Sequence, residues 1–323
     1  MRQSSTFEHP KQMIGKWDGW GRFRQSMNST SRSTCNRLLR QHAKRSLAAR
    51  LLCALSLVVV SGLAAAQQTP KPQKSQGAHP DLNGVWQVLN TANYDLLPHE
   101  ARAAMELRPG PAQPVPAKAV LALGAVGAVP AGLGVVVGDE IPYQAWALSK
   151  KKENQEHWLE RDPEIKCYLP GVPRANYMPF PFQIVQNESD IFIAYEFAGA
   201  TRNIFLKDPG APPADSWMGL SVGHWEGSTL VVKVTGLNDS TWFDRSGDFH
   251  SDQLEVMERY TLTSPATMRY EATITDPKVF TRPWTMSMTL YRRVGVDAQL
   301  LQFKCVPFVE ELIYGQLRKH PLP

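Results

Sequence analysis

The pattern of hydrophobic and polar positions is that of β-structure from residue 182 to residue 306. Short runs in which apolar and polar residues alternate are separated by Asn, Asp, Ser, Gly or Pro, as in strands joined by turns. Many short strands at close spacing, with no helices between them, indicate an antiparallel barrel or sandwich. The predicted strands are residues 182–186, 191–197, 202–206, 228–236, 253–262, 268–276, 284–293 and 300–306.

Upstream of this region the predicted elements are sparse. Residues 85–89 form a first strand after a turn, and residues 145–161 form one helix with a charged face. Residues 109–138 are rich in Gly, Ala, Val and Pro, a composition that opposes a spanning helix and favours a long apolar loop. We therefore expect an all-β antiparallel barrel with this loop and one short helix inserted before the main sheet.

The N-terminal region has the pattern of an export signal. Residues 51–66 are an apolar run that is preceded by basic residues and ends in three alanines, which predicts a signal peptide and leaves a membrane anchor as the alternative. Residues 67–80 are polar and proline-rich, as in a disordered tether. The predicted parts are a signal peptide with an upstream extension at 1–66, the tether at 67–80, and a single barrel domain at 81–323.

Removal of the leader changes the charge of the protein. Residues 1–66 contain 11 of the 35 Lys and Arg residues and 2 of the 30 Asp and Glu residues, which leaves 24 basic and 28 acidic residues and a net charge of −4. A mildly acidic protein lacks the basic surface that nucleic acid requires. We expect a small-molecule ligand, with neither nucleic acid nor stable membrane insertion; no oligomeric state follows.

Two cysteines remain after the leader, Cys167 and Cys305. An even pair in an exported chain predicts one disulfide, with two buried thiols as the alternative. The leader and the expected bridge together predict a periplasmic or secreted protein.

Several sequence blocks carry a resemblance that covers residues 80 to about 318. The blocks are PDLNGVW, IPYQAWAL, CYLPGVPR, PFQIVQ, GHWEGSTLVV, TWFDRSGDFHSD, ERYTL and DPKVFTRPW. They resemble a family of secreted bacterial proteins without an assigned reaction, and Gly84-Val85-Trp86 resembles the Gly-x-Trp start of lipocalin-type barrels. The resemblance implies an exported, lipocalin-like barrel. Ser228 stands where the family's block is expected to carry Asp, which argues against an essential role for this position.

Strand periodicity places a group of polar residues on one face. If the predicted strand at residues 253–262 is extended back to residue 250, its even-numbered side chains share one face. Leu254 and Val256 lie on this face and need burial, so the face is expected to point inward. On the neighbouring strand, His224 and Glu226 have the same parity as the aliphatic residues that need burial. Asp244 is placed at the rim of the same pocket. The predicted catalytic residues are His250, Asp252, Glu258, Asp244 and Tyr260, and His224 and Glu226 are placed in the same pocket.

Three interpretations of this group remain open. His250 with Asp252 or Asp244 could form a general acid–base pair, because a carboxylate fixes the imidazole tautomer. Two imidazoles with carboxylates could bind a divalent metal, although His-x-Glu and His-x-Asp lack a specific ligand spacing. The same residues could pair with arginines or lysines in structural salt bridges. No metal or other cofactor is assigned.

The leading functional hypothesis is a barrel that binds a small apolar or aromatic molecule. Non-hydrolytic acid–base chemistry of the lyase or isomerase type, centred on His250, is part of this hypothesis. A carrier without chemistry and an envelope structural protein are the alternatives. The predicted ligand-binding residues are Arg174, Tyr177, Trp217, Trp242, His224 and Glu226.

Overall fold

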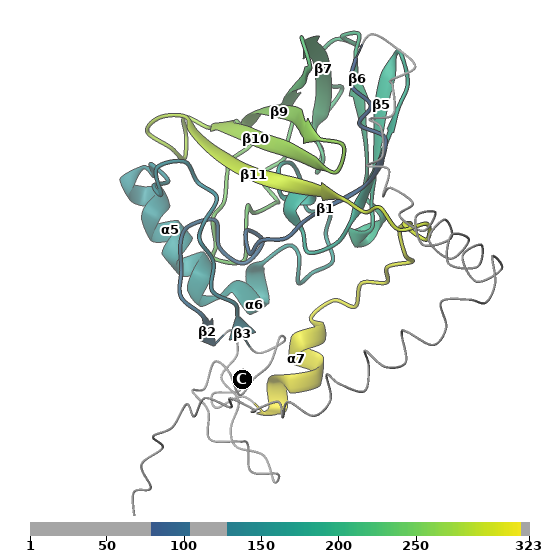
Figure 1. Ribbon diagram of the computed structural model, residues 1–323. Helices are drawn as coiled ribbons and strands as arrows, with labels where there is room; N and C mark the ends of the chain where they lie inside the picture. The colour runs from purple at the N-terminus through teal and green to yellow at the C-terminus, as the bar shows by residue number, and fades with distance from the viewer. Residues whose placement is uncertain (1–78, 104–127, 318–323) are drawn as a thin grey trace, which may run out of the picture. The chain divides into compact units, whose positions relative to one another are not determined.

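The computed structural model describes residues 79–103 and 128–317 (Figure 1). The predicted signal peptide, most of the tether and residues 109–127 of the apolar loop lie outside the described residues. These predictions stay untested by the fold.

Nine strands close into a barrel, which confirms the predicted β-barrel. Around the barrel the order is β1-β11-β10-β9-β8-β7-β6-β5-β4, with β4 returning to β1. The strands are β1 (Gly84–Val88), β4 (Phe182–Gln186), β5 (Asp190–Tyr195), β6 (Thr201–Phe205), β7 (Leu220–Glu226), β8 (Thr229–Thr235), β9 (Glu255–Ser264), β10 (Thr267–Thr275) and β11 (Trp284–Arg292).

One pair of neighbours departs from the expected antiparallel arrangement. β6 and β7 run parallel, with Ile204 opposite Ser221 and Phe205 opposite Val222. All other neighbours in the barrel are antiparallel. The barrel is therefore mixed, and the prediction of a purely antiparallel sheet was wrong.

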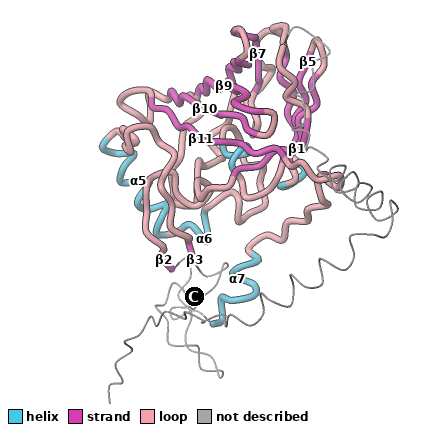
Figure 2. The backbone as a smooth tube through the Cα atoms, in the orientation of Figure 1, coloured by secondary structure: helices cyan, strands magenta, loops and turns pink. Residues whose placement is uncertain are grey.

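The remaining elements lie on the connections between strands or, for two of them, after the last strand. Figure 2 shows α5 (Ala145–Glu156) and α6 (Trp158–Arg161) apart from the barrel strands, among loops. The break at His157 divides the predicted helix into α5 (Ala145–Glu156) and α6 (Trp158–Arg161). The other elements are β2 (Arg102–Ala103), β3 (Ala128–Val129), α7 (Val309–Tyr314) and the short 3₁₀ turns η1 (Arg174–Tyr177), η2 (Phe197–Gly199) and η3 (Gly315–Leu317).

The period-two pattern of the sequence produces the filled interior. On β10, Met268, Tyr270, Ala272 and Ile274 are fully buried, because successive side chains of a strand point to opposite faces. The η1 turn is buried together with them, and Asn176 on this turn bonds to Glu258 on β9. Side chains from the wall and from η1 therefore share the interior.

Two segments differ from the prediction. β7 was not predicted, and it forms a hairpin with β8. Residues 300–306 form no strand; Leu301 is 62% exposed, and this segment is bonded to the domain through Cys305. None of the helices in the described ranges combines the length and apolar character that crossing a bilayer requires.

Candidate functional site

His224 and Glu226 lie on the surface, so their predicted place in a pocket was wrong. Their side chains are 63% and 49% exposed, and His224 Nε2 lies 3.2 Å from Glu226 Oε1. Arg259 also pairs with Glu226, at 2.9 Å. The turn between β7 and β8 explains the error, because strand parity does not continue across a hairpin.

Asp252 also lies outside any buried group. Its side chain is 53% exposed and pairs with Lys278 at 2.7 Å. β9 begins only at Glu255, so the residues before it do not follow the pleat of the strand. The prediction that Asp252 points into a cavity was wrong for this reason.

Glu258 and Tyr260 point into the barrel, as the parity of β9 predicts. Glu258 Oε1 accepts hydrogen bonds from Asn176 (2.9 Å), Arg202 (3.1 Å), Tyr260 (2.9 Å) and Tyr270 (2.8 Å). Arg202 also pairs with the second carboxylate oxygen. Burial and the carboxylate of Glu258 raise the pKa of Tyr260 well above its ordinary value.

The rest of this interior network is satisfied as well. Arg202 Nε donates to Ser221 at 2.7 Å, and the Tyr195 hydroxyl donates to Asn176 at 2.9 Å. A buried ion pair whose remaining donors and acceptors are all bonded is a structural arrangement. The network occupies space inside the barrel that a ligand would otherwise take.

Arg174 and Tyr177 are also buried, and their side chains form hydrogen bonds within the protein. Arg174 bonds to both oxygens of Asp162, at 2.8 and 3.1 Å, and to Glu164 at 2.7 Å. Tyr177 donates to the carbonyl of Phe243 at 2.8 Å. Both side chains are about 1% exposed, so the structure places neither at a ligand surface.

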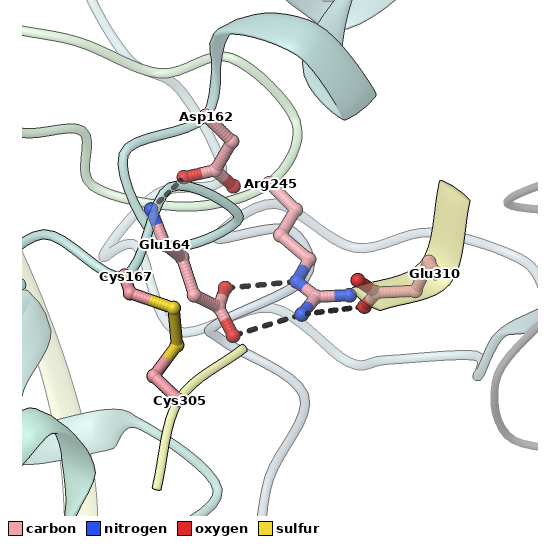
Figure 3. The surroundings of a disulfide bond; sticks show 6 residues. All are labelled: Asp162, Glu164, Cys167, Arg245, Cys305 and Glu310. Carbon is pink, nitrogen blue, oxygen red and sulfur yellow. Dashed lines mark hydrogen bonds and ion pairs between the residues drawn. A yellow bond between two sulfur atoms is a disulfide. The ribbon is translucent and has the colours of Figure 1, made fainter. Parts of the chain in front are cut away.

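The ion-pair network beside Arg174 adjoins the disulfide. Arg245 forms two bonds of 2.8 Å with Glu164 and lies 3.5 Å from Glu310. Figure 3 shows this group next to the bridge between Cys167 and Cys305. The Cα atoms of the two cysteines are 5.7 Å apart, and the predicted disulfide is confirmed. The bridge and the ion pairs together hold the C-terminal segment on the domain.

His250 is buried, but its partners are not the predicted carboxylates. Nδ1 lies 2.9 Å from the carbonyl of Ser251, and Nε2 lies 2.6 Å from Oγ1 of Thr241. A carbonyl only accepts, so the proton is assigned to Nδ1, and Nε2 accepts from the threonine hydroxyl. Burial lowers the pKa of His250. The imidazole is therefore held neutral in one tautomer.

A glycine makes room for this contact. Gly171 has a φ of +71°, and a Cβ at this position would lie 2.6 Å from Oγ1 of Thr241. An L side chain would be strained by the backbone conformation and would also displace the threonine hydroxyl. Gly171 thus leaves the space that the Thr241 side chain occupies where it contacts His250.

Asp244 accepts three backbone hydrogen bonds. The donors are the N–H groups of Leu96 (2.8 Å), Ser246 (2.9 Å) and Asp248 (3.2 Å). Burial, and then the carboxylate of Asp248, raise the pKa of Asp244 well above its ordinary value. Asp95 and Asp248 lie close enough for the three carboxylates to hold a metal ion.

A hollow of about 500 Å³ lies outside the barrel. We call it the aromatic cleft. Trp146 of α5 is 56% exposed and Tyr168 is 46% exposed; the Trp146 ring lies 6.0 Å from that of Phe249. Its lining includes Trp146, Tyr168, Trp242, Phe249 and His250, with Lys150, Arg161, Lys166 and Asp239.

Charges around the cleft are predominantly positive. Arg161 is neutralised by Glu153 at 2.8 Å. Lys150 and Lys166 form no side-chain ion pair within the described ranges. One carboxylate, Asp239, belongs to the lining. An anionic group would therefore be favoured here over a cationic one.

Of the predicted ligand-binding residues, Trp242 lines the cleft and Trp217 packs nearby. The ring of Trp217 lies 4.9 Å from that of Tyr168. Sequence reasoning missed Trp146, Tyr168 and Lys150. Trp146 and Tyr168 belong to the blocks IPYQAWAL and CYLPGVPR, and Trp242 and His250 to TWFDRSGDFHSD. Their place within these specific blocks was the available signal, and the structure brings the blocks together at one hollow.

Comparisons with protein-family models, with curated proteins and with solved structures found no match. The closed nine-strand barrel is compatible with a lipocalin-like fold. The resemblance to a family of secreted bacterial proteins stays a prediction.

Proposed function

We propose that this chain is an exported β-barrel protein that binds a small aromatic anion in the aromatic cleft. One observation carries the proposal: two large aromatic side chains, Trp146 and Tyr168, are about half exposed at the wall of a hollow. Exposed apolar surface that is gathered around a concavity is typical of a binding site.

The size and the lining of the cleft support this ligand class. Its volume of about 500 Å³ lies within the roughly 300–1,000 Å³ of small-molecule sites. Aromatic rings offer flat faces for stacking. Lys150 and Lys166 add positive charge at the rim. A planar aromatic group with a carboxylate matches both features.

Binding without chemistry is the better supported form of this function. Both ring nitrogens of His250 already have partners, Thr241 and the Ser251 carbonyl. The same imidazole lines the cleft and stays neutral, which is the form that accepts a proton. This observation favours a lyase or isomerase as the second candidate. In such a reaction Nε2 gives up the hydrogen bond from the Thr241 hydroxyl and accepts a proton from the substrate.

Export rests on the leader and on the disulfide. A bridge between Cys167 and Cys305 fits a protein that works outside the reducing cytosol. The apolar run at 51–66 with its basic flank supports a periplasmic or secreted location.

The binding test uses 2-naphthoate and indole-3-acetate with their primary amides as uncharged controls, measured by isothermal titration and tryptophan fluorescence. We expect the acids to bind, and Trp146→Ala to weaken them at least about tenfold, since a buried aromatic contact contributes more than about 1.4 kcal/mol. Trp225→Ala is the matched control, because Trp225 lies on β7. Absence of binding, or equal effects of the two substitutions, would refute the proposed site.

Charge and chemistry are tested separately. Lys150→Glu with Lys166→Glu should weaken the acids more than the amides, whereas Lys207→Glu, an exposed control, should change neither. If the cleft is catalytic, exchange of a substrate C–H proton with D₂O should occur with the wild type and stop in His250→Ala. Exchange that continues in the variant would remove His250 from the chemistry.

A further inference from the structure

Three buried carboxylates meet between the segment that precedes β2 and the loop at residues 241–251. We call Asp95, Asp244 and Asp248 the carboxylate cluster. One carboxylate oxygen from each lies within 4.8 Å of the other two. Their exposed fractions are 6%, 0% and 0%. Three carboxyl groups are therefore gathered away from water.

Hydrogen-bond donors account for every cluster oxygen except one. Both oxygens of Asp95 and both of Asp244 accept bonds from backbone or side-chain donors. On Asp248, Oδ1 accepts from the Tyr143 hydroxyl at 2.6 Å. Its Oδ2 is buried, and within the described part of the chain no donor reaches it. A buried acceptor that lacks a partner is unfavourable, so Oδ2 marks a place where a positive group is expected.

The described residues do not balance the charge of the cluster. Arg102 bonds to Asp95 at 3.1 Å, and its side chain is 37% exposed. One contacting guanidinium against three buried carboxylates leaves room for a further cation.

The spacing and the donor type select a hard ion. These cluster oxygens all lie within 4.8 Å of one another, a spacing that one Ca²⁺ can bridge at its metal–oxygen distances of about 2.3–2.6 Å. Mg²⁺ usually keeps several waters and binds only one or two protein carboxylates, so three buried carboxylates favour Ca²⁺. The cluster consists of oxygen donors alone, which disfavours zinc and copper. Tyr143 and Ser246 bring further oxygens that already bond to cluster carboxylates.

We propose that the carboxylate cluster is a Ca²⁺ site. The ion would contact Oδ2 of Asp248 and join Asp95 to the 241–251 loop. That loop carries Trp242, Phe249 and His250 of the aromatic cleft, so the ion would fix the cleft wall. The Ca²⁺ site stands on different residues from the proposed ligand site, and either can fail without the other.

Close packing supports a structural role for this ion. Gly247 has a φ of +89°, and a Cβ there would lie 2.7 Å from the backbone of α5, at Lys151 and Gln155. The loop therefore lies directly on the helix beside the cluster. An ion that holds Asp244 and Asp248 would also hold this contact.

The experiment uses the exported protein after EDTA treatment and gel filtration into metal-free buffer at pH 7. Thermal unfolding is followed with added CaCl₂, MgCl₂ or neither, and bound calcium is counted by equilibrium dialysis with elemental analysis. We expect about one Ca²⁺ per chain and a rise in Tm of roughly 5 °C or more at Ca²⁺ concentrations about 100-fold above Kd, with a smaller effect of Mg²⁺.

Two substitutions separate the cluster from general calcium effects. Asp248→Asn should abolish the calcium response while leaving the metal-free Tm equal or higher, because it removes one of the repelling charges. Asp252→Asn is the matched control, since Asp252 is an exposed carboxylate paired with Lys278, and it should keep the response. If Asp248→Asn does not fold, Asp95→Asn takes its place.

A cluster neutralised by a proton would overturn the proposal. In that case no calcium binds and the Tm is the same with and without CaCl₂. A raised pKa for Asp244 then gives stability that is complete below the unfolded pKa and is lost as the pH rises through the folded one. Retention of the calcium response in both Asp248→Asn and Asp95→Asn would equally reject this site.

Discussion

The buried pair of Arg202 and Glu258 gives the sharpest prediction of stability. Both side chains are about 1% exposed or less, and Glu258 also accepts bonds from Asn176, Tyr260 and Tyr270. Glu258→Gln keeps the size of the side chain but removes its charge. Arg202 would then remain buried without a counter-ion, and the new amide N–H₂ would face groups that are themselves donors.

The expected loss follows from this arrangement. Removal of one partner of a buried ion pair costs about 3–5 kcal/mol, because the other charge is left unpaired. For a domain of this size each kcal/mol lowers Tm by roughly 2–4 °C, so the expected decrease is about 6–20 °C. Glu255→Gln on the same strand is the control. Glu255 is 52% exposed and pairs with Lys233 at 3.1 Å, so its loss should cost less than about 1 kcal/mol.

The assay is urea denaturation of four proteins: the wild type, Glu258→Gln, Arg202→Met and the double variant. The double variant should be more stable than the sum of the single losses predicts, by at least about 1 kcal/mol, since it buries no unpaired charge. A loss below about 1 kcal/mol for Glu258→Gln, or strict additivity in the double variant, would refute this account of the barrel interior.

Three further predictions concern the disulfide, the acid limb of stability and the leader. Reduction of the Cys167–Cys305 bridge, which closes a separation of 138 residues, should lower the free energy of unfolding by about 5 kcal/mol in the chain-entropy model; denaturant curves with and without reductant measure this, and equal midpoints would contradict it. Burial raises the pKa of Glu164, but Arg245 and Arg174 outweigh burial and lower it from 4.5 to about 2. Stability from Glu164 is thus present above pH 4.5 and lost as the pH falls toward 2. Glu164→Gln should reduce the loss of unfolding free energy over this pH range by roughly 3 kcal/mol. A loss as large as that of the wild type would argue against the interaction of Glu164 with the two arginines. Intact-mass measurement of the exported protein should show a start near Gln67; a mass that includes residues 51–66 would contradict cleavage there.

Much of the barrel was predictable because apolar and polar residues alternate with the strand period of two along the sequence. β4 has the predicted bounds, and β8 to β11 differ by a few residues. The inward positions of Glu258 and Tyr260 follow from the same periodicity, because Val256 on the same face must be buried. The disulfide was predictable from the even number of cysteines together with the export signal. These are local or counting arguments, and neither requires knowledge of distant contacts.

The site was less predictable because it depends on loops. The sequence carries no periodic signal for residues 241–251, so the parity extended back from β9 failed at Asp252. The partner of His250 is Thr241, a contact that only the course of the loop creates. Trp146 on α5 and Tyr168 meet across the cleft through tertiary packing, which no pattern along the chain encodes.

The count of nine strands has a consequence for the parallel pair. In a closed ring, every pair of neighbouring strands can be antiparallel only if the number of strands is even. A nine-membered ring must therefore contain at least one like-directed pair, and here that mismatch lies between β6 and β7. The connection at residues 206–219 must consequently return along the barrel from one end to the other. With two paired residues in its ladder, this seam is where amide hydrogen exchange should first report opening of the ring.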